Sequence, residues 1–177
     1  MNERVSLYAS SLYNVAQEEK CEREVHESLV MVKAVLSENG EYVKIMSSAA
    51  IALEEREKLL EEAFSGNVHP FVLNFMKLLS KKRAFEILPM VAESYEKAYF
   101  KDNNIERVKI TTAIELGDEK KAEILKRISS STGKELLAQF LVDETLMGGI
   151  IIETEQSSID ASLSGKLESV KRYISKI

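Results

Sequence analysis

The sequence has little of what disulfides, metal sites and membrane spans are made from. Its 177 residues include one cysteine, two histidines, two prolines and no tryptophan. Because Cys21 has no second thiol in the chain to pair with, an internal disulfide is excluded, and we expect a reducing compartment. No apolar run approaches the roughly 20 residues that a membrane-spanning helix needs, and the N-terminus carries no signal-peptide pattern. We therefore expect a soluble, cytoplasmic protein.

Positive charge is also in deficit. Lysine and arginine number 24 against 29 aspartates and glutamates, which gives a formal net charge of −5. Binding to a nucleic-acid backbone needs concentrated positive charge, so nucleic acid is not the expected partner. Hydrophobic residues make up 45% of the chain, which is enough to form a buried core. The charge balance does not exclude binding to another folded protein.

The first part of the chain, up to about residue 104, has only helical periodicity. Its apolar residues recur every three or four positions, which is the spacing of one helix face. Helix ends are indicated at Gly40 and Gly66, and Pro70 suits the first turn of a helix. Residues 1–104 therefore predict a bundle of six short helices.

After residue 104 the period changes to that of strands. Val108–Ile114 alternates in the β pattern, and further strands are expected over Leu136–Val142 and Ile150–Thr154. Asp118 is expected to cap an intervening helix. Residues 105–177 thus predict a small mixed α/β domain, and the fold class expected for the whole chain is α plus α/β.

A final helix is expected after Asp160, whose carboxylate can cap the free amides of the first turn. The apolar stripe of this helix comprises Leu163, Leu167, Val170, Ile174 and Ile177.

Motifs for nucleotide, metal or nucleophilic chemistry are missing or incomplete. The nearest approach to a phosphate loop, at Gly133, has Ile128 and Glu135 where such a loop needs a glycine and a hydroxyl. His26, expected at a helix surface, and His69, expected at a helix start, lie on different predicted helices, so surface or capping roles are favoured over metal ligation. We predict no catalytic residue, no cofactor and no metal.

Two of the predicted helices carry more apolar surface than one buried face requires. In the first, a stripe that is expected to be core is widened by small and aromatic residues; the stripe is Val5, Tyr8, Leu12 and Val15, and the widening residues are Ala9, Tyr13 and Ala16. In the fifth, residues 71–79 are mostly apolar. Either these helices are sealed by internal packing, or they keep a face for the helix of a partner.

Short motifs follow one another in order along nearly the whole chain. They are Tyr8-Ala9-x-x-Leu12-Tyr13-x-x-Ala16, Phe75-x-x-Leu78-Leu79-x-Lys81-x-Arg83, Leu88-Pro89 with Tyr95, Ile110-Thr111-Thr112-Ala113, Thr132-Gly133-Lys134, Val142-Asp143, Leu146-Met147-Gly148-Gly149-Ile150 and Ile159-Asp160-x-Ser162. In this order and spacing the chain resembles the delta subunits of F-type ATP synthase, called oligomycin sensitivity-conferring protein in mitochondria.

The resemblance implies a non-catalytic stator subunit. It would link the alpha/beta catalytic head to the b-type peripheral stalk, so that the head resists rotor torque during proton-driven ATP synthesis. Residues 1–104 would bind N-terminal helices of the alpha subunit, and residues 105–177 would bind the C-terminal end of the stalk subunit. The protein would lie at the cytoplasmic face of a bacterial cell membrane and reach the membrane only through the complex.

The resemblance also implies where the alpha helix binds, in a groove between the first and fifth helices. Carried over by position, the groove would be lined by Tyr8, Ala9, Leu12, Tyr13, Ala16, Phe71, Phe75, Leu78 and Leu79. The alternative is another helical adaptor protein that binds the amphipathic helix of a different partner in this groove.

Overall fold

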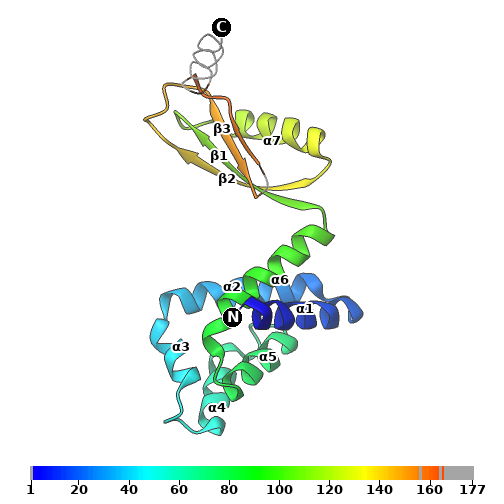
Figure 1. Cartoon of the computed structure of the whole chain (residues 1–177), viewed down its shortest axis with the longest axis vertical. Coiled ribbons are helices and arrows are strands. Elements are labelled where there is room, and N and C mark those ends of the chain that lie inside the picture. Colours follow the sequence, from blue (N-terminus) through cyan, green and yellow to red (C-terminus); the bar gives the residue numbers. More distant parts are fainter. Residues whose placement is uncertain (1, 156, 164, 166–177) are drawn as a thin grey trace. The chain divides into compact units, whose positions relative to one another are not determined.

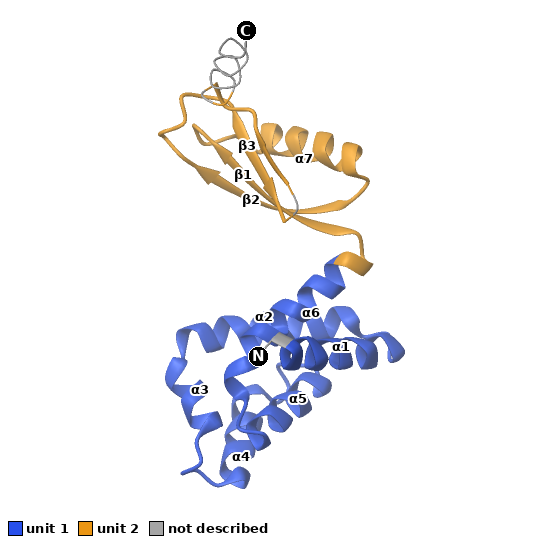
Figure 2. Cartoon of the chain, viewed as in Figure 1, with its two compact units in different colours: residues 1–100 blue, residues 101–177 orange. Residues whose placement is uncertain are grey.

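The computed structural model describes residues 2–155, 157–163 and 165. The chain divides into two compact units, residues 1–100 and residues 101–177 (Figure 2). The sequence predicts the boundary after residue 104, and the structure divides inside the last helix of the first part. Each unit has its own core, so the two are described separately.

The first unit is helical (Figure 1). Its elements are α1 (Asn2–Glu18), α2 (Glu22–Glu38), α3 (Gly40–Ser47), α4 (Leu53–Phe64), α5 (Pro70–Lys81), the 3-10 turn η1 (Phe85–Ile87) and α6 (Leu88–Asp102). Among the described residues a seventh α-helix, in the second unit, follows these six. The prediction of helices is confirmed, but the helical part is not simply a six-helix bundle, because η1 is inserted before α6.

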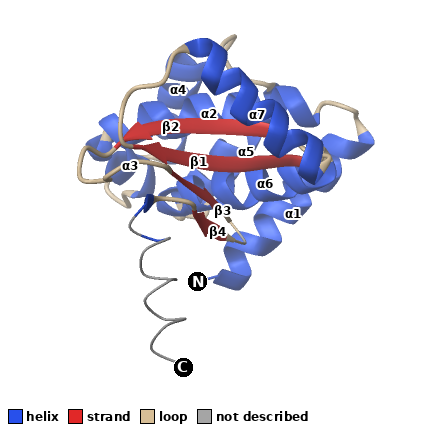
Figure 3. Ribbon diagram, turned by 90° about the horizontal axis from the view of Figure 1, so that it is seen from above, coloured by secondary structure: helices blue, strands red, loops and turns tan. Residues whose placement is uncertain are grey.

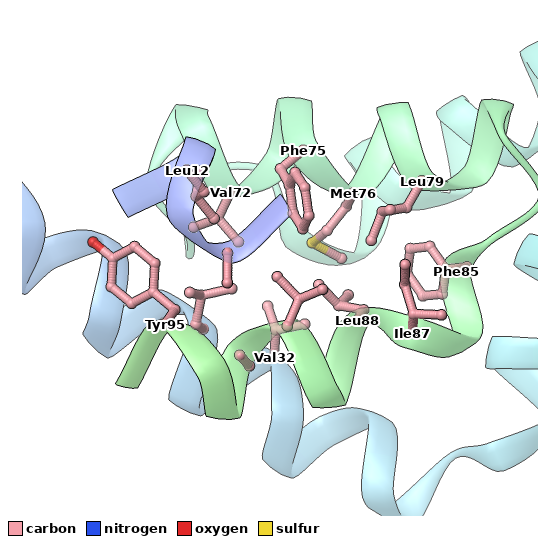
Figure 4. Packing of buried hydrophobic residues seen from close by; sticks show 14 of the residues in the cluster. Leu12, Val32, Val72, Phe75, Met76, Leu79, Phe85, Ile87, Leu88 and Tyr95 are labelled. Atoms are coloured by element: carbon pink, nitrogen blue, oxygen red, sulfur yellow. The ribbon is translucent and has the colours of Figure 1, made fainter. Parts of the chain in front are cut away.

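The core of the first unit lies where α1, α2, α5 and α6 meet. Met76 and Leu79 on α5 face Leu88 on α6 (Figure 4), and all three side chains are at most 1% exposed. The Tyr95 ring meets the Tyr13 ring edge-on, with 5.1 Å between centroids. The Tyr95 hydroxyl donates a hydrogen bond to a backbone carbonyl of α2, so this buried polar group is satisfied.

A buried arginine joins three of these helices. Arg56, on α4, is 4% exposed. Its Nη1 donates to the carbonyl oxygens of Met46 and Ser80, each at 2.7 Å. These carbonyls belong to the last turns of α3 and α5, where helices present unpaired acceptors and the negative pole of their dipoles. The guanidinium therefore ties α4 to two helix ends.

The second unit is a mixed four-stranded sheet with one helix on it. Its elements are β1 (Ile105–Thr112), α7 (Asp118–Thr132), β2 (Glu135–Val142), β3 (Ile150–Thr154) and β4 (Ser158–Asp160). The strand order is β2-β1-β3-β4. β1 and β2 are parallel and are connected through α7, whereas β3 pairs antiparallel with β1 and with β4.

Helix α7 lies along one face of this sheet (Figures 1 and 3). Val108 and Ile110 of β1 are buried. The strand register places them beside Ala138 and Phe140 of β2. Side chains alternate between the faces of a strand, so these four share one face, and Lys121 of α7 lies over the Phe140 ring at 5.7 Å.

Three local predictions for the second unit are corrected. The first strand begins at Ile105 and ends at Thr112 instead of spanning 108–114. Asp118 is the first residue of α7, and Gly117, which has extended backbone, takes the N-cap position. Glycine has no side chain, so the helix starts without a side-chain cap, and the carbonyl of Gly117 accepts the first helical bond from the amide of Lys121.

The third correction concerns Asp160, which ends the unpredicted strand β4. The amide of Gly165 donates to the Ser162 hydroxyl at 3.0 Å. Asp160 instead accepts the amide of Ser162 at 2.8 Å. Of the expected final apolar stripe, Leu163 is described and exposed, while Leu167, Val170, Ile174 and Ile177 lie outside the described residues.

Gly149 is required by close contact between chain segments. Its φ is +91°, and a Cβ there would lie 2.5 Å from the carbonyl oxygen of Ala161. Both glycines of the Gly148-Gly149 turn have positive φ, and the turn lets β3 begin directly against the end of β4.

Arg56→Met should destabilise the first unit, because the carbonyls of Met46 and Ser80 lose their charged donor and keep only neutral ones, among them the Ser80 hydroxyl and the Arg83 amide. We expect the free energy of unfolding in urea to fall by about 2–4 kcal/mol. Lys58→Met is the matched control, since the Lys58 side chain on the same helix is 74% exposed, and it should change stability by less than about 0.5 kcal/mol. Equal stability of the two variants would contradict the role assigned to Arg56.

Candidate functional site

An open apolar hollow lies between α1 and α5. Its volume is about 220 Å³, and it is lined by Tyr8, Ser11, Leu12, Val15, Phe71, Asn74, Phe75 and Leu78. We call it the α1/α5 groove.

The groove follows from the helical spacing of its residues. On α1 the lining residues recur at three- and four-residue steps from Tyr8 to Val15, and on α5 they recur in the same way from Phe71 to Leu78. Such residues share one helix face. The Tyr8 ring meets the Phe75 ring edge-on at 5.9 Å between centroids, which fixes the two stripes side by side.

The groove has a buried floor and exposed walls. Leu12 and Phe75 are each 7% exposed, whereas Val15 and Leu78 are 42% and 41% exposed. Water therefore reaches apolar carbon on both helices. Filling the groove with another apolar side chain would remove that surface from water, at about 25 cal/mol per Å².

The start of α5 is built to place Phe71. Pro70 takes the first helical position, where its missing amide hydrogen costs nothing. The Nδ1 atom of His69 accepts the amide of Phe71 at 3.3 Å, and the Ser28 hydroxyl on α2 accepts the amide of His69 at 2.9 Å. His69 thus has the capping role favoured for it from the sequence.

The nine residues expected to line the groove fall into two sets. Tyr8, Leu12, Phe71, Phe75 and Leu78 line it. Ala9, Tyr13, Ala16 and Leu79 are at most 6% exposed and pack into the core. Sequence reasoning missed Ser11, Val15 and Asn74.

The stripe of α1 that was expected to be core therefore contributes Tyr8 and Val15 to the groove, and the residues that widen it face inward. Spacing alone could have found Val15, which lies seven residues after Tyr8. No sequence signal marks polar Ser11 and Asn74 as groove residues.

A second hollow, of about 600 Å³, adjoins the groove at Tyr8. It is lined by Arg4, Tyr8, Lys82, Arg83, Ala84, Glu86 and Ile87. Lys82 and Arg83, which follow α5, thus share this hollow with Arg4 of α1.

His26 is not at the helix surface where the sequence places it. Its side chain is 15% exposed, and its Nε2 lies 3.5 Å from a carboxylate oxygen of Glu96. Its ring stacks on Tyr99 at 4.6 Å between centroids. This stacking partner, Tyr99, belongs to α6. The periodicity of one helix does not show which other helix packs against it, so the burial of His26 could not be predicted from α2 alone.

The described residues also bear on two other kinds of site. They contain no group of three or more His, Cys, Asp or Glu side chains arranged to hold a metal ion. None of their helices is both long and apolar enough to cross a membrane.

The second unit also exposes apolar side chains. Leu137 and Leu141 of β2 are 54% and 37% exposed, and they alternate with the residues that share the face of α7. Beside them Lys109 pairs with Glu153 at 2.9 Å across β1 and β3. A shallow hollow of about 410 Å³ includes Leu137, Lys109 and Glu153 in its lining.

Comparison with known proteins gives a consistent result along the chain. The family model described as ATP synthase delta (OSCP) subunit matches residues 5–174. The ATP synthase subunit delta of Leuconostoc mesenteroides is 33% identical over 168 residues, which cover 94% of this chain and 93% of that protein. The protein of the same name from Prochlorococcus marinus strain MIT 9211 is 32% identical and is covered to 98%.

The fold is also shared with a solved structure. A chain in the cryo-EM structure of the Toxoplasma gondii mitochondrial ATP synthase hexamer superposes with a TM-score of 0.73, with 96% of each chain covered. Its sequence identity is 15%, so this likeness concerns the fold alone.

Two neighbouring leucines on α5 test which face of this helix is turned toward the core. Leu79→Ala should lower the free energy of unfolding by about 2–5 kcal/mol, because Leu79 is fully buried and its loss leaves a cavity. Leu78→Ala should lower it by less than about 1 kcal/mol, since that side chain is partly in water. Urea denaturation of both variants measures the difference, and a reversed order would rule out the described orientation of α5.

Proposed function

This chain belongs to the ATP synthase delta (OSCP) subunit family, and we propose that it is the stator subunit that ties the catalytic head of its synthase to the peripheral stalk. The family is that of a structural subunit in an enzyme complex that couples ATP synthesis to ion transport. In this proposal the chain supplies no catalytic residue and no cofactor of its own. It supplies two binding surfaces.

The first surface is the α1/α5 groove, which binds an amphipathic N-terminal helix of the alpha subunit. The observation that carries this assignment is the open apolar hollow between two helices, with aromatic rings at Tyr8, Phe71 and Phe75. An amphipathic helix inserts its apolar residues into such a groove at three- and four-residue steps. Aromatic residues that fill pockets contribute most of the binding energy in many interfaces.

The energetic demand on this interface is high, because the head must not turn with the rotor. A nanomolar dissociation constant corresponds to about −12 kcal/mol. A protein–protein interface of standard size, which can provide such an affinity, buries about 800 Å² on each partner. A helix of several turns lying in the groove, with contacts on the walls at Val15 and Leu78, would provide an interface of that kind.

The second surface belongs to the second unit and binds the C-terminal end of the b-type stalk subunit. Its support is the exposed apolar face around Leu137 and Leu141. Through these two contacts the protein is held at the cytoplasmic face of a bacterial cell membrane, as a peripheral part of the complex. No direct contact with lipid or nucleic acid is required.

A different helical adaptor would use the same groove for another partner. Co-purification of the intact chain with the alpha and b subunits from its own cells distinguishes the two functions. Recovery of neither subunit would favour the adaptor.

Charge placed on the groove walls should abolish binding without unfolding the protein. For Val15→Asp with Leu78→Asp, we expect at least about a hundredfold weaker binding of a synthetic alpha-subunit N-terminal peptide, because two carboxylates would be buried against apolar carbon. Isothermal titration calorimetry of the full chain measures the dissociation constant.

The matched control is Val30→Asp with Val35→Asp. These valines, on α2, are 47% and 40% exposed and do not line the groove. The control should bind the peptide like the wild type. Equal affinities of wild type and groove variant would refute the groove as the binding site.

A further inference from the structure

The two ends of the α1/α5 groove carry charges of opposite sign. Arg4, Tyr8, Ser11, Val15 and Glu18 follow one another on α1 at steps of four, three, four and three residues. Such a series lies on one helix face. The stripe that lines the groove is therefore basic before Tyr8 and acidic after Val15.

The basic end is reinforced from α5. Tyr8 lines both the groove and the hollow of about 600 Å³, so the two lie next to each other. In that hollow Arg4 meets Lys82 and Arg83, and the only carboxylate in its lining is that of Glu86. Among the described residues these three cations form no ion pair. Their charge is available to a ligand.

The acidic end is formed by Glu18 and Glu19, which are both exposed. They lie three and four residues after Val15, and the last turn of α1 contains no basic residue. Lys20, beyond the helix, is the nearest cation in the sequence, and its φ of +56° marks where the chain turns away.

The helix dipoles do not override these side chains. Arg4 at the start of α1 lies beside Lys82 at the end of α5, so the two helices run antiparallel along the groove. Their positive and negative poles therefore lie together at each end and largely offset each other. The side-chain charges decide the polarity of the groove.

We propose that the groove accepts its helix in one polarity only, with acidic side chains of the ligand over Arg4, Lys82 and Arg83, and basic side chains beside Glu18 and Glu19. The inference rests on the proposed function of the groove as a binding site for an alpha-subunit helix. Apolar contacts in the groove provide affinity but distinguish poorly between the two directions, because a leucine fits either way. Opposed charges at the ends provide that discrimination, since reversing the helix would set like charges against each other.

Reversing the basic end tests this polarity. In Arg4→Glu with Lys82→Glu, both sites are exposed, so the fold should persist, and circular dichroism checks this. The full chain is titrated with the synthetic N-terminal peptide of the alpha subunit. We expect binding weaker by about tenfold in low salt, and by less than about threefold in 1 M salt, where charges are screened beyond about 3 Å.

The control variant, Lys120→Glu with Lys126→Glu, makes the same change in net charge on exposed positions of α7 in the second unit. It should bind the peptide like the wild type at both salt concentrations. A second peptide, with its acidic residues replaced by lysine, should bind the Arg4→Glu, Lys82→Glu variant more tightly than it binds the wild type.

The outcomes separate the two proposals. Failure of the unmodified peptide to bind the wild type would overturn the proposed function. Binding that is equally tight in the wild type and in the Arg4→Glu, Lys82→Glu variant at low salt would overturn the polarity alone. Rescue by the lysine-substituted peptide would support it, because a merely structural defect at Arg4 or Lys82 would weaken both peptides alike.

Discussion

The edge-to-face contact of Tyr8 with Phe75 holds α1 and α5 together where their outer apolar stripes meet. Each of these helices is apolar over more than one face, and a small bundle can cover only one. The inner faces, represented by Ala16 and Met76, are fully buried against the other helices of the unit. The outer stripes have only each other, and they remain as an open hollow. In the proposed function, stability and binding therefore use different faces of the same two helices.

Much of the fold could be predicted from the sequence, because helix and strand periods and their punctuation are local properties. The predicted third strand coincides with β3, and Pro70 begins α5 as its position indicates. Other features depend on tertiary contacts. β4 has three residues and is exposed, so it has no periodicity to detect. Arg56 sits in a charge-rich helix, and only the fold shows that it is enclosed by the ends of α3 and α5.

The candidate site was predicted in outline but not in detail, for a related reason. Spacing shows that α1 has a wide apolar arc, but it cannot say which edge of the arc turns inward. That choice is made by partners distant in sequence. The Tyr13 ring packs against Tyr95 of α6, which commits the side of α1 carrying Ala9 and Ala16 to the core. Val15 is then left at the surface, although its residue type would suit either place.

A stator contact has two requirements that one kind of interaction does not meet. It must be strong under load, which favours buried apolar area because its strength hardly depends on salt. It must also be formed in one direction, and apolar stripes are nearly symmetric end to end. Exposed ion pairs contribute little free energy. A reversed helix, however, would turn each attraction at the groove ends into a repulsion. The difference in binding free energy between the two directions is then about twice the energy of the attractions alone. A groove with an apolar middle and ends of opposite charge, as between Arg4 and Glu18, meets both requirements with few residues.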